Sequence, residues 1–329
     1  MNDEGHGSLR RRVLAGACAI ACLLAIAAAA ERWLEARDEA RLAGADTFAD
    51  AGGARVRYRL AGADRPGAPV VFINGMAGSL EQWEFLQNEV SAFAPALAYD
   101  RGGLGFSHGS RAHDGAQQAD ELAEVLTALG IRRPVVVVGY STSASIARIF
   151  ASRHPSMTAG LLLLDPDLPE IEGRIPGRHN PFRTYFKPLL QDTVTSLFGL
   201  RRLASRISEW RGRFVLHTLA EERAHAVLLR FSHWWAVDRE WMRVEDTSRQ
   251  VREIGSLGSI PVLIYTGNLH FEGAANRLYL DLVRALAART SHGDLRSFGE
   301  GTEHGKILED PRTRTVIASG IRELAAAER

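Results

Sequence analysis

Four short runs of consecutive apolar residues limit the folds open to this chain more than any other feature of its 329 residues. They are Pro69–Ile73, Val135–Val138, Leu161–Leu164 and Pro261–Tyr265. Unbroken runs of this kind are typical of strands that are buried on both faces. Segments of helical periodicity, such as Gln117–Leu129 and Ser143–Ser152, lie between them. This alternation predicts an α/β fold with a mainly parallel central sheet and helices on both of its faces.

The alternation of strands and helices stops between residues 168 and 255. This stretch is rich in Arg, Leu and aromatic residues, among them Trp234, Trp235 and Trp241, and it predicts several short helices. Because it lies between two expected strands of the sheet, we predict that it is a helical lid. The core would then consist of residues 51–167 and 256–329.

An apolar segment near the N-terminus predicts a contact with a membrane. Residues 13–30 carry no charge, follow Arg10–Arg12 and are closed by Glu31 and Arg32. Their length is at the lower limit for a transmembrane helix. A cleaved signal peptide with a small-residue site near residues 28–30, an uncleaved signal-anchor and a buried helix are the alternatives. The basic flank disfavours the buried helix, and the length of the run favours the anchor.

The charges around this segment predict its orientation. Arginines precede it and none cluster directly after it, so residues 1–12 would be a short cytoplasmic tail under the positive-inside rule. Residues 31–50 mix charged residues with Ala and predict a helical or irregular tether. The catalytic domain would therefore be extracytoplasmic, either anchored in the membrane or secreted after cleavage.

Charge and cysteine content exclude several functional classes. The chain has 40 Lys and Arg against 39 Asp and Glu, a formal net charge of +1, which does not indicate a nucleic-acid partner. Both cysteines, Cys18 and Cys22, lie in the apolar segment. The domain beyond it can therefore have no disulfide, cysteine nucleophile or Cys-ligated zinc. No His-Glu-x-x-His motif or acidic cluster has the spacing of metal ligands, so we expect no metal.

Residues 135–147 place a serine on a tight turn between a buried strand and a helix. The turn reads Gly139-Tyr-Ser141-Thr-Ser143. Small residues are needed on both sides of such a turn, since the strand and the helix approach closely. Gly139 meets this need, whereas Ser143 stands where the G-x-S-x-G pattern has its second glycine. This context predicts that Ser141 is a nucleophile. Taken alone, the segment leaves open a Ser- and Thr-rich helix start with Ser141 or Thr142 as the N-cap.

Three further motifs make residues 51–329 resemble the α/β-hydrolase superfamily. Phe72–Gly78 resembles the loop after the family's third strand, with Asn74 in place of the usual histidine. Tyr99–Ser107 resembles the Asp-x-x-Gly-x-Gly-x-Ser turn after the fourth strand, and Gly301–Gly305 resembles the loop that carries the catalytic histidine. Four motifs in the family's order are far more specific than any one of them.

The resemblance implies a role for each of these parts. Ser141 would attack the substrate, while His304 would accept its proton and return it to the leaving group. The backbone N–H groups of Met76 and Thr142 match the family's two donors to the oxyanion. The order of Ser before His along the chain also fits this family.

The acid of the expected triad departs from the common pattern. After the seventh strand the family usually has Gly-x-x-Asp, but this chain has His270 at the position of the acid. Asp165 directly follows the run Leu161–Leu164 and matches an alternative acid position in the family. Glu272 lies two residues beyond the usual position. We expect Asp165 to be the acid, with Glu272 as the alternative. The other interpretation of Asp165 is that it only ends the strand in an Asp-Pro turn.

These features predict a membrane-anchored serine hydrolase that cleaves a carboxylic ester or related acyl compound through an acyl-enzyme. It would need no metal and no organic cofactor. The membrane segment and the aromatic lid favour a small, apolar acyl substrate. Asn74, Ser143 and His270 depart from the family pattern. They leave open the alternative of a non-catalytic member that binds a ligand or a partner.

Overall fold

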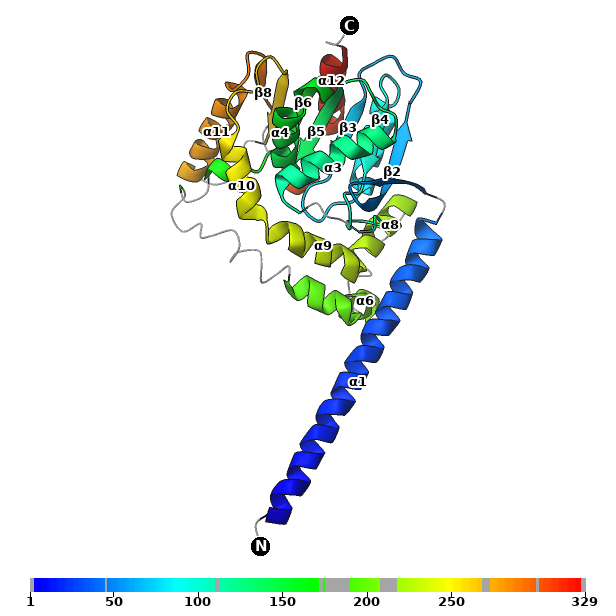
Figure 1. The fold of residues 1–329 in the computed structure, drawn as a ribbon. Helices are drawn as coiled ribbons and strands as arrows, with labels where there is room; N and C mark the ends of the chain where they lie inside the picture. Colours follow the sequence, from blue (N-terminus) through cyan, green and yellow to red (C-terminus); the bar gives the residue numbers. More distant parts are fainter. Residues whose placement is uncertain are drawn as a thin grey trace.

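The strands form one open sheet, which contains the four apolar runs at its centre. The computed structural model describes residues 3–44, 46–109, 113–171, 174, 190–207, 218–267, 273–299 and 302–326. The strands are β1 Thr47–Ala51, β2 Ala54–Ala61, β3 Val70–Ile73, β4 Ala96–Tyr99, β5 Val135–Tyr140, β6 Thr158–Leu164, β7 Val262–Thr266 and β8 Gly293–Ser297. Their order in the sheet is β1-β2-β4-β3-β5-β6-β7-β8 (Figure 1).

The pairing confirms the mainly parallel sheet that the sequence predicts. β2 is antiparallel to both β1 and β4, whereas each pair from β4 across to β8 is parallel. The apolar runs become β3, β5, β6 and β7, all central strands. On β3, Val71 and Ile73 join one hydrophobic cluster while Val70 and Phe72 join another. An unbroken apolar run supplies both faces of the sheet at once because successive side chains point in opposite directions.

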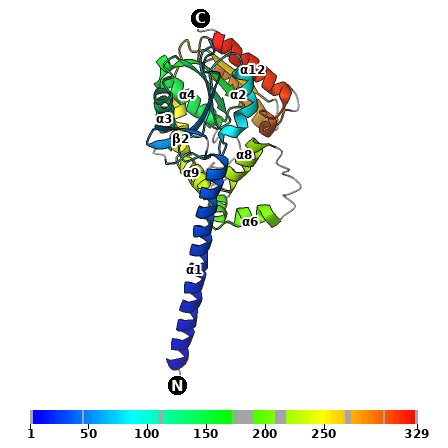
Figure 2. The same cartoon turned by 90° about the vertical axis from the view of Figure 1, so that its right-hand side faces the viewer.

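Helices cover both faces of the sheet. α3 (Gly115–Ala128), α4 (Ser143–Arg153) and α11 (Gly273–Ala287) pack on one face. α2 (Glu84–Val90) and α12 (Pro311–Ala326) pack on the other, as Figure 2 shows from the side. Short 3₁₀ helices occur at η1 Leu80–Trp83, η2 Pro155–Met157, η3 Pro169–Ile171 and η4 His304–Lys306.

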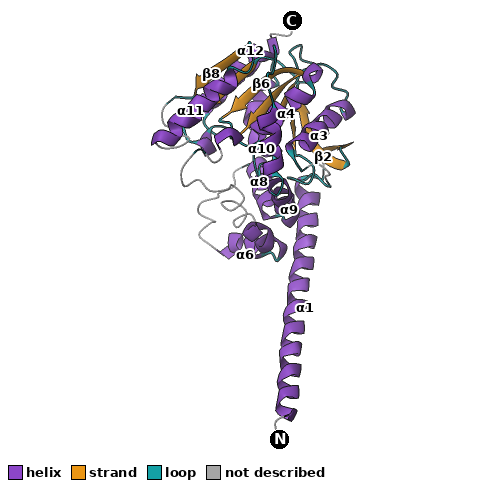
Figure 3. Ribbon diagram, turned by 60° about the vertical axis from the view of Figure 1, so that its left-hand side comes forward, coloured by secondary structure: helices purple, strands orange, loops and turns teal. Residues whose placement is uncertain are grey.

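Helices also fill the described parts of the chain between β6 and β7. They comprise a helical segment at 190–197, α6 Leu200–Ile207, α8 Leu219–Leu229, α9 Phe231–Trp241 and α10 Val244–Glu253. α10 packs against α3 and α4, while α6 lies farther from the sheet than α8 and α9 (Figures 1 and 3). Trp234 and Trp241 of α9 are buried with Leu104, whereas Trp235 is exposed.

The N-terminal helix α1 extends from Asp3 to Leu42 and leaves the domain as a long rod (Figure 1). In the described part of the chain it is the one helix long and apolar enough to cross a membrane, and its apolar stretch is not buried. Residues 31–50, which the sequence predicts to be a tether, continue this helix to Leu42 and then enter the sheet at Thr47. There β1 forms the edge of the sheet and pairs antiparallel with β2.

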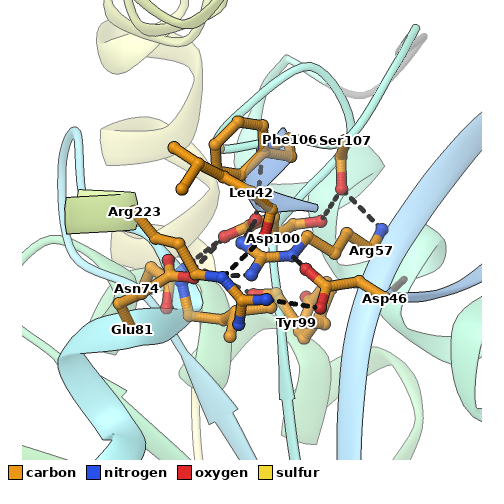
Figure 4. Close-up of polar contacts among 12 residues, drawn as sticks. Leu42, Asp46, Arg57, Asn74, Glu81, Tyr99, Asp100, Phe106, Ser107 and Arg223 are labelled. Atoms are coloured by element: carbon orange, nitrogen blue, oxygen red, sulfur yellow. Dashed lines mark hydrogen bonds and ion pairs between the residues drawn. The ribbon is translucent and has the colours of Figure 1, made fainter. Parts of the chain in front are cut away.

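A buried charge cluster joins the edge of the sheet to the helices between β6 and β7 (Figure 4). The Arg57 guanidinium on β2 lies 2.6 Å from Asp46, 2.6 Å from Glu81 and 3.2 Å from Asp100. Arg223 of α8 lies 3.0 Å from Asp46. Burial alone would lower the pKa of Arg57, but the three carboxylates outweigh it and raise that pKa. Removing one partner from such a cluster typically costs 3–5 kcal/mol, since it leaves a buried charge unpaired.

Candidate active site

The loops that carry the expected site residues follow neighbouring parallel strands. In the register of the sheet, Tyr140 at the end of β5 pairs with Leu164, and Leu164 pairs with Tyr265 on β7. The carboxyl ends of parallel strands lie at one edge of a sheet, where ligands bind in open α/β folds. Ser141 and Asp165 each come one residue after these paired positions, so the sheet itself brings the two side chains to the same edge.

Ser141 lies on a strained turn between β5 and α4. Its φ is 58°, in the left-handed region that non-glycine residues rarely adopt. The turn is held because the Ser141 N–H donates to the Leu164 carbonyl at 3.0 Å. A Cβ on Gly139 would lie 2.9 Å from the Ser143 carbonyl oxygen, so only glycine allows this approach of strand and helix.

His304, in η4, lies between the serine and a carboxylate. Its Nε2 is 3.1 Å from the Ser141 Oγ, and its Nδ1 is 2.5 Å from Asp165 Oδ2. A neutral imidazole has one donor and one acceptor nitrogen. With the proton on Nδ1 facing Asp165, Nε2 is left to accept a proton from the serine hydroxyl. The arrangement can therefore perform general base chemistry at Ser141.

The Asp165 carboxylate is buried and its second oxygen is also satisfied. The Oδ1 atom accepts hydrogen bonds from the Thr266 hydroxyl at 3.0 Å and the Gly267 N–H at 3.3 Å, both at the end of β7. Hydrogen bonds to the charged form favour an ionised carboxylate. Glu272, the alternative acid, lies outside the described residues, as does His270.

The loop after β3 lies against the serine. A Cβ on Gly75 would be 3.2 Å from the Tyr140 carbonyl oxygen and 3.6 Å from the Ser141 Cβ. The next residue is Met76, and Thr142 directly follows the serine at the start of α4. Within the described part of the chain, the backbone N–H groups of Met76 and Thr142 donate no hydrogen bond. The N-terminus of α4, directly after Thr142, adds its partial positive charge at this edge of the sheet.

Backbone strain is concentrated at this edge of the sheet. Among the described residues, the non-glycine positions with positive φ are Ala77 at 55°, Ser141 at 58° and Asp165 at 41°. Each such residue costs of order 1–3 kcal/mol and persists only where the surrounding structure holds it. All three belong to the loops that meet at the site.

A sequence model described as alpha/beta hydrolase fold matches residues 68–240, just over half of the chain. The chain belongs to the α/β-hydrolase fold family. The match includes the turns after β3, β4, β5 and β6, and this family membership supports a hydrolase. The resemblance predicted from the sequence motifs is thereby confirmed.

Solved structures of the family share the fold over most of the chain. An epoxide hydrolase, CorEH, is 22% identical with a TM-score of 0.62, and it covers 86% of this chain and 99% of its own. A thermophilic esterase from Thermogutta terrifontis is 18% identical with a TM-score of 0.61, over 85% of this chain and 99% of its own. At these identities the likeness shows the fold alone.

Curated relatives match only part of their own length. The protein YqjL of Bacillus subtilis is 35% identical over 103 residues, which are 31% of this chain and 41% of that relative. The chain spans less than half the length of the curated relatives it matches.

The structure gives a local reason for the first departure from the family's usual pattern, Asn74. Its side-chain oxygen accepts from the Trp83 indole N–H at 2.7 Å and from Gln82 at 3.2 Å, and its amide donates to the Tyr99 carbonyl at 3.1 Å. The Arg101 guanidinium donates to the Asn74 carbonyl at 2.5 Å. In this α/β hydrolase an asparagine therefore anchors the loop that precedes Met76.

Ser143, the second departure, is accommodated by hydrogen bonds. Its hydroxyl donates to the Ile73 carbonyl at 2.8 Å and accepts from the Tyr140 N–H at 2.9 Å. The side chain is fully buried. Ser143 thus links β3 to the turn that carries Ser141. A glycine at position 143 would have no side chain to make these contacts.

Tyr140 also contributes to the site, which the sequence motifs did not predict. Its ring stacks on His304 with centroids 5.0 Å apart, and its hydroxyl donates to the His304 carbonyl at 2.5 Å. Burial raises the pKa of the Tyr140 phenol, and the Asp165 and Glu309 carboxylates raise it further, so the hydroxyl remains a donor. The sequence feature that could have predicted this role is the position of Tyr140 directly before Ser141, at the end of a buried strand.

His233 connects α9 to the turn after β4. The side chain is fully buried, and its Nδ1 accepts from the Gly105 N–H at 3.0 Å. Burial lowers the pKa of His233 to about 3, and the nearby Arg230 contributes to the same shift. The imidazole is therefore neutral in the folded protein, as the acceptor role of Nδ1 requires.

The neutral state of His233 makes stability depend on pH. In the unfolded chain the pKa returns to about 6.5, so between pH 6.5 and about 3 the unfolded state binds a proton that the folded state does not. The stabilisation that neutral His233 contributes is fully present above about pH 6.5. Below this pH it falls on acidification, by roughly 1.4 kcal/mol of unfolding free energy per pH unit.

We expect His233→Asn, which keeps an acceptor for the Gly105 N–H, to remove this contribution from the pH dependence of the unfolding free energy. Denaturant unfolding in detergent from pH 7 to 4 measures it, and equal slopes in both proteins would contradict the assignment.

Proposed function

We propose that the protein is a serine hydrolase that cleaves a carboxylic ester or related acyl compound through an acyl-enzyme. The observation that carries the proposal is the position of His304, with Nε2 at 3.1 Å from Ser141 Oγ and Nδ1 at 2.5 Å from Asp165. A serine hydroxyl is a weak nucleophile at neutral pH and needs an adjacent base that a third group orients.

In the proposed acylation step, Ser141 Oγ attacks the substrate carbonyl while its proton moves to His304 Nε2. The Asp165 carboxylate stabilises the imidazolium that forms. His304 then returns the proton to the leaving alcohol, and the acyl group stays on Ser141. Water attacks this ester in the second half-reaction, with His304 again as the base. Each proton transfer is performed by residues of the chain, without a metal or an organic cofactor.

The oxyanion of the tetrahedral intermediate would be bound by the N–H groups of Met76 and Thr142. Both donors belong to backbone that is already fixed, so little reorganisation is needed as the charge develops. The Asn74 contacts hold the first donor loop, and the helical start of α4 holds the second. Loss of one such donor typically costs about 3 kcal/mol of transition-state stabilisation.

The same proposal includes an anchor, since α1 carries an exposed apolar stretch after three arginines. Residues 1–12 would be the cytoplasmic tail and residues 13–30 the anchor, with secretion after cleavage as the alternative. The core of residues 51–167 and 256–329 and the lid of residues 168–255 would be extracytoplasmic. The substrate would be a small, apolar acyl compound, and nothing in the charge balance calls for nucleic acid.

Covalent labelling tests the nucleophile. We expect a fluorophosphonate probe to label the full-length protein and Ser141→Ala to abolish the label, because the probe reacts only with an activated serine. Ser152→Ala, an exposed serine on the same helix α4, is the matched control and should label like the wild type. A folded wild-type protein that never labels would favour the non-catalytic alternative, a member of the family that binds a ligand or a partner.

The acid is tested by a pair of amide substitutions. We expect Asp165→Asn to lower turnover of an ester by at least ~10²-fold, since the imidazole loses the group that fixes its tautomer and stabilises its charge. Glu272→Gln should change turnover by less than ~10-fold. Steady-state kinetics provides the measurement, and thermal unfolding checks that each variant is folded. The reverse ranking would assign the acid to Glu272.

A further inference from the structure

The C-terminal part of α1 presents a row of carboxylates to the lid. Glu35, Asp38 and Glu39 come four, seven and eight positions after Glu31 and therefore lie on the same side of the helix. Glu31 and Glu35 are 1% and 3% exposed, although both carry a charged side chain. Buried carboxylates require partners, and these lie on the lid.

Two arginines of the lid bind this row. Arg202 of α6 lies 2.8 Å from Glu31 and 2.6 Å from Asp38. Arg230, directly before α9, lies 3.0 Å from Glu39. These ion pairs tie the lid to α1 at positions along more than two turns of the helix, so the two cannot rotate independently.

Glu35 makes a different contact, with the start of α9. Its carboxylate accepts hydrogen bonds from the backbone N–H groups of Phe231 and Ser232. The N-terminus of a helix carries a partial positive charge, which favours an acidic partner. The same face of α1 thus binds both side chains and a helix end, which fixes the lid relative to the axis of α1.

This docking sets the height of α6 along the membrane helix. Glu31 is the first charged residue after the uncharged residues 13–30, whose helical length of about 27 Å is close to the thickness of a bilayer's hydrocarbon core. A Cβ on Gly199, one residue before α6, would lie 3.1 Å from Glu31 Oε2. Figures 1 and 2 both show α6 as the labelled lid helix nearest the N-terminal half of α1. α6 therefore begins where α1 would leave the hydrocarbon.

The lid exposes apolar side chains at this same height. Leu200 and Leu203 of α6 are 50% and 52% exposed, and Leu190 and Val194 of the preceding helical segment are 43% and 44% exposed. Each pair is spaced three or four residues apart, which places its members on one helix face. Exposed apolar side chains gathered beside a membrane-spanning segment are typical of a membrane-contact surface. Trp33 of α1, also exposed, has the residue type that is enriched at the membrane interface.

We infer that the helical segment 190–197 and α6 contact the outer surface of the bilayer that holds α1. Through this surface the substrate reaches the lid from the membrane, so the substrate class is an apolar acyl ester that partitions into the bilayer. The membrane contact rests on the proposed anchor, and the delivery of substrate rests also on the proposed hydrolase activity. The bilayer is the partner of this surface because α1 holds these apolar residues at the height of the membrane boundary.

Site-specific fluorescence tests the contact. In full-length protein with Cys18→Ser and Cys22→Ser, an environment-sensitive label is placed at Leu203→Cys, Ile20→Cys or Val316→Cys. The protein is reconstituted in phosphatidylcholine vesicles that contain nitroxide-labelled lipid. Val316 is the matched control, since it is 40% exposed but lies on α12, at the far end of the domain (Figure 1). We expect about twofold or greater quenching at positions 20 and 203 and none at position 316.

The outcomes separate the surface from the anchor. Quenching at position 20 without quenching at position 203 would overturn the lid contact and leave the anchor intact. No quenching at either position would overturn both. The measurement does not use catalysis, so it is independent of Ser141.

Delivery is tested with two esters, 4-nitrophenyl palmitate in vesicles and 4-nitrophenyl acetate in solution. We expect Leu203→Glu to lower the rate of palmitate hydrolysis by ~10-fold, because a charged side chain at this surface disfavours its contact with the bilayer. The rate of acetate hydrolysis should stay unchanged. Val316→Glu should alter neither rate. An equal loss on both esters, or no loss on either, would overturn delivery from the membrane. A wild-type protein that hydrolyses neither ester would refute the hydrolase and, with it, delivery.

Discussion

The candidate site depends on the parallel alignment of β3, β5, β6 and β7. These strands are apolar on both faces, so the sheet gains its stability from burial between two helical layers. Their carboxyl ends then fall in register, and the loops after them can meet only at that edge. The same burial holds Ala77, Ser141 and Asp165 in backbone conformations that each would avoid in isolation. Strain at the site is thus balanced by ordinary packing elsewhere.

Buried charge has a second organising role, because it joins the helices between β6 and β7 both to the sheet and to α1. Arg57 links β2 to Asp100 in the turn after β4, and Arg223 extends that cluster to α8. The carboxylates of α1 bind the lid in the same manner. Charges in such places are costly unless paired, so each cluster permits few alternative arrangements of the helices involved. If the proposed anchor holds, this specificity transmits the position of the membrane to the lid.

The sequence predicted the parts of this protein that local signals encode. The apolar runs became the central strands, and the small residues around Ser141 became the turn between β5 and α4. For residues 31–50 the sequence left a helical and an irregular tether open, and the structure has a helix to Leu42 whose carboxylates pair with Arg202 and Arg230. Asp165 was preferred over Glu272 on the order of the strands. Its contact with His304 agrees with that preference, while Glu272 lies outside the described residues.

Sequence alone therefore determined the α/β class, the serine turn and the apolar segment near the N-terminus, since each is a pattern of neighbouring residues with its own period or turn chemistry. Tertiary structure decided what has no such pattern. The stacking of Tyr140 on His304, the hydrogen bond from Asn74 to Tyr99 and the ion pair of Glu31 on α1 with Arg202 on α6 all join residues far apart in the chain. Such contacts form only when the sheet and its helices are assembled, because the sequence around a charged or aromatic residue does not indicate which distant residue it will contact.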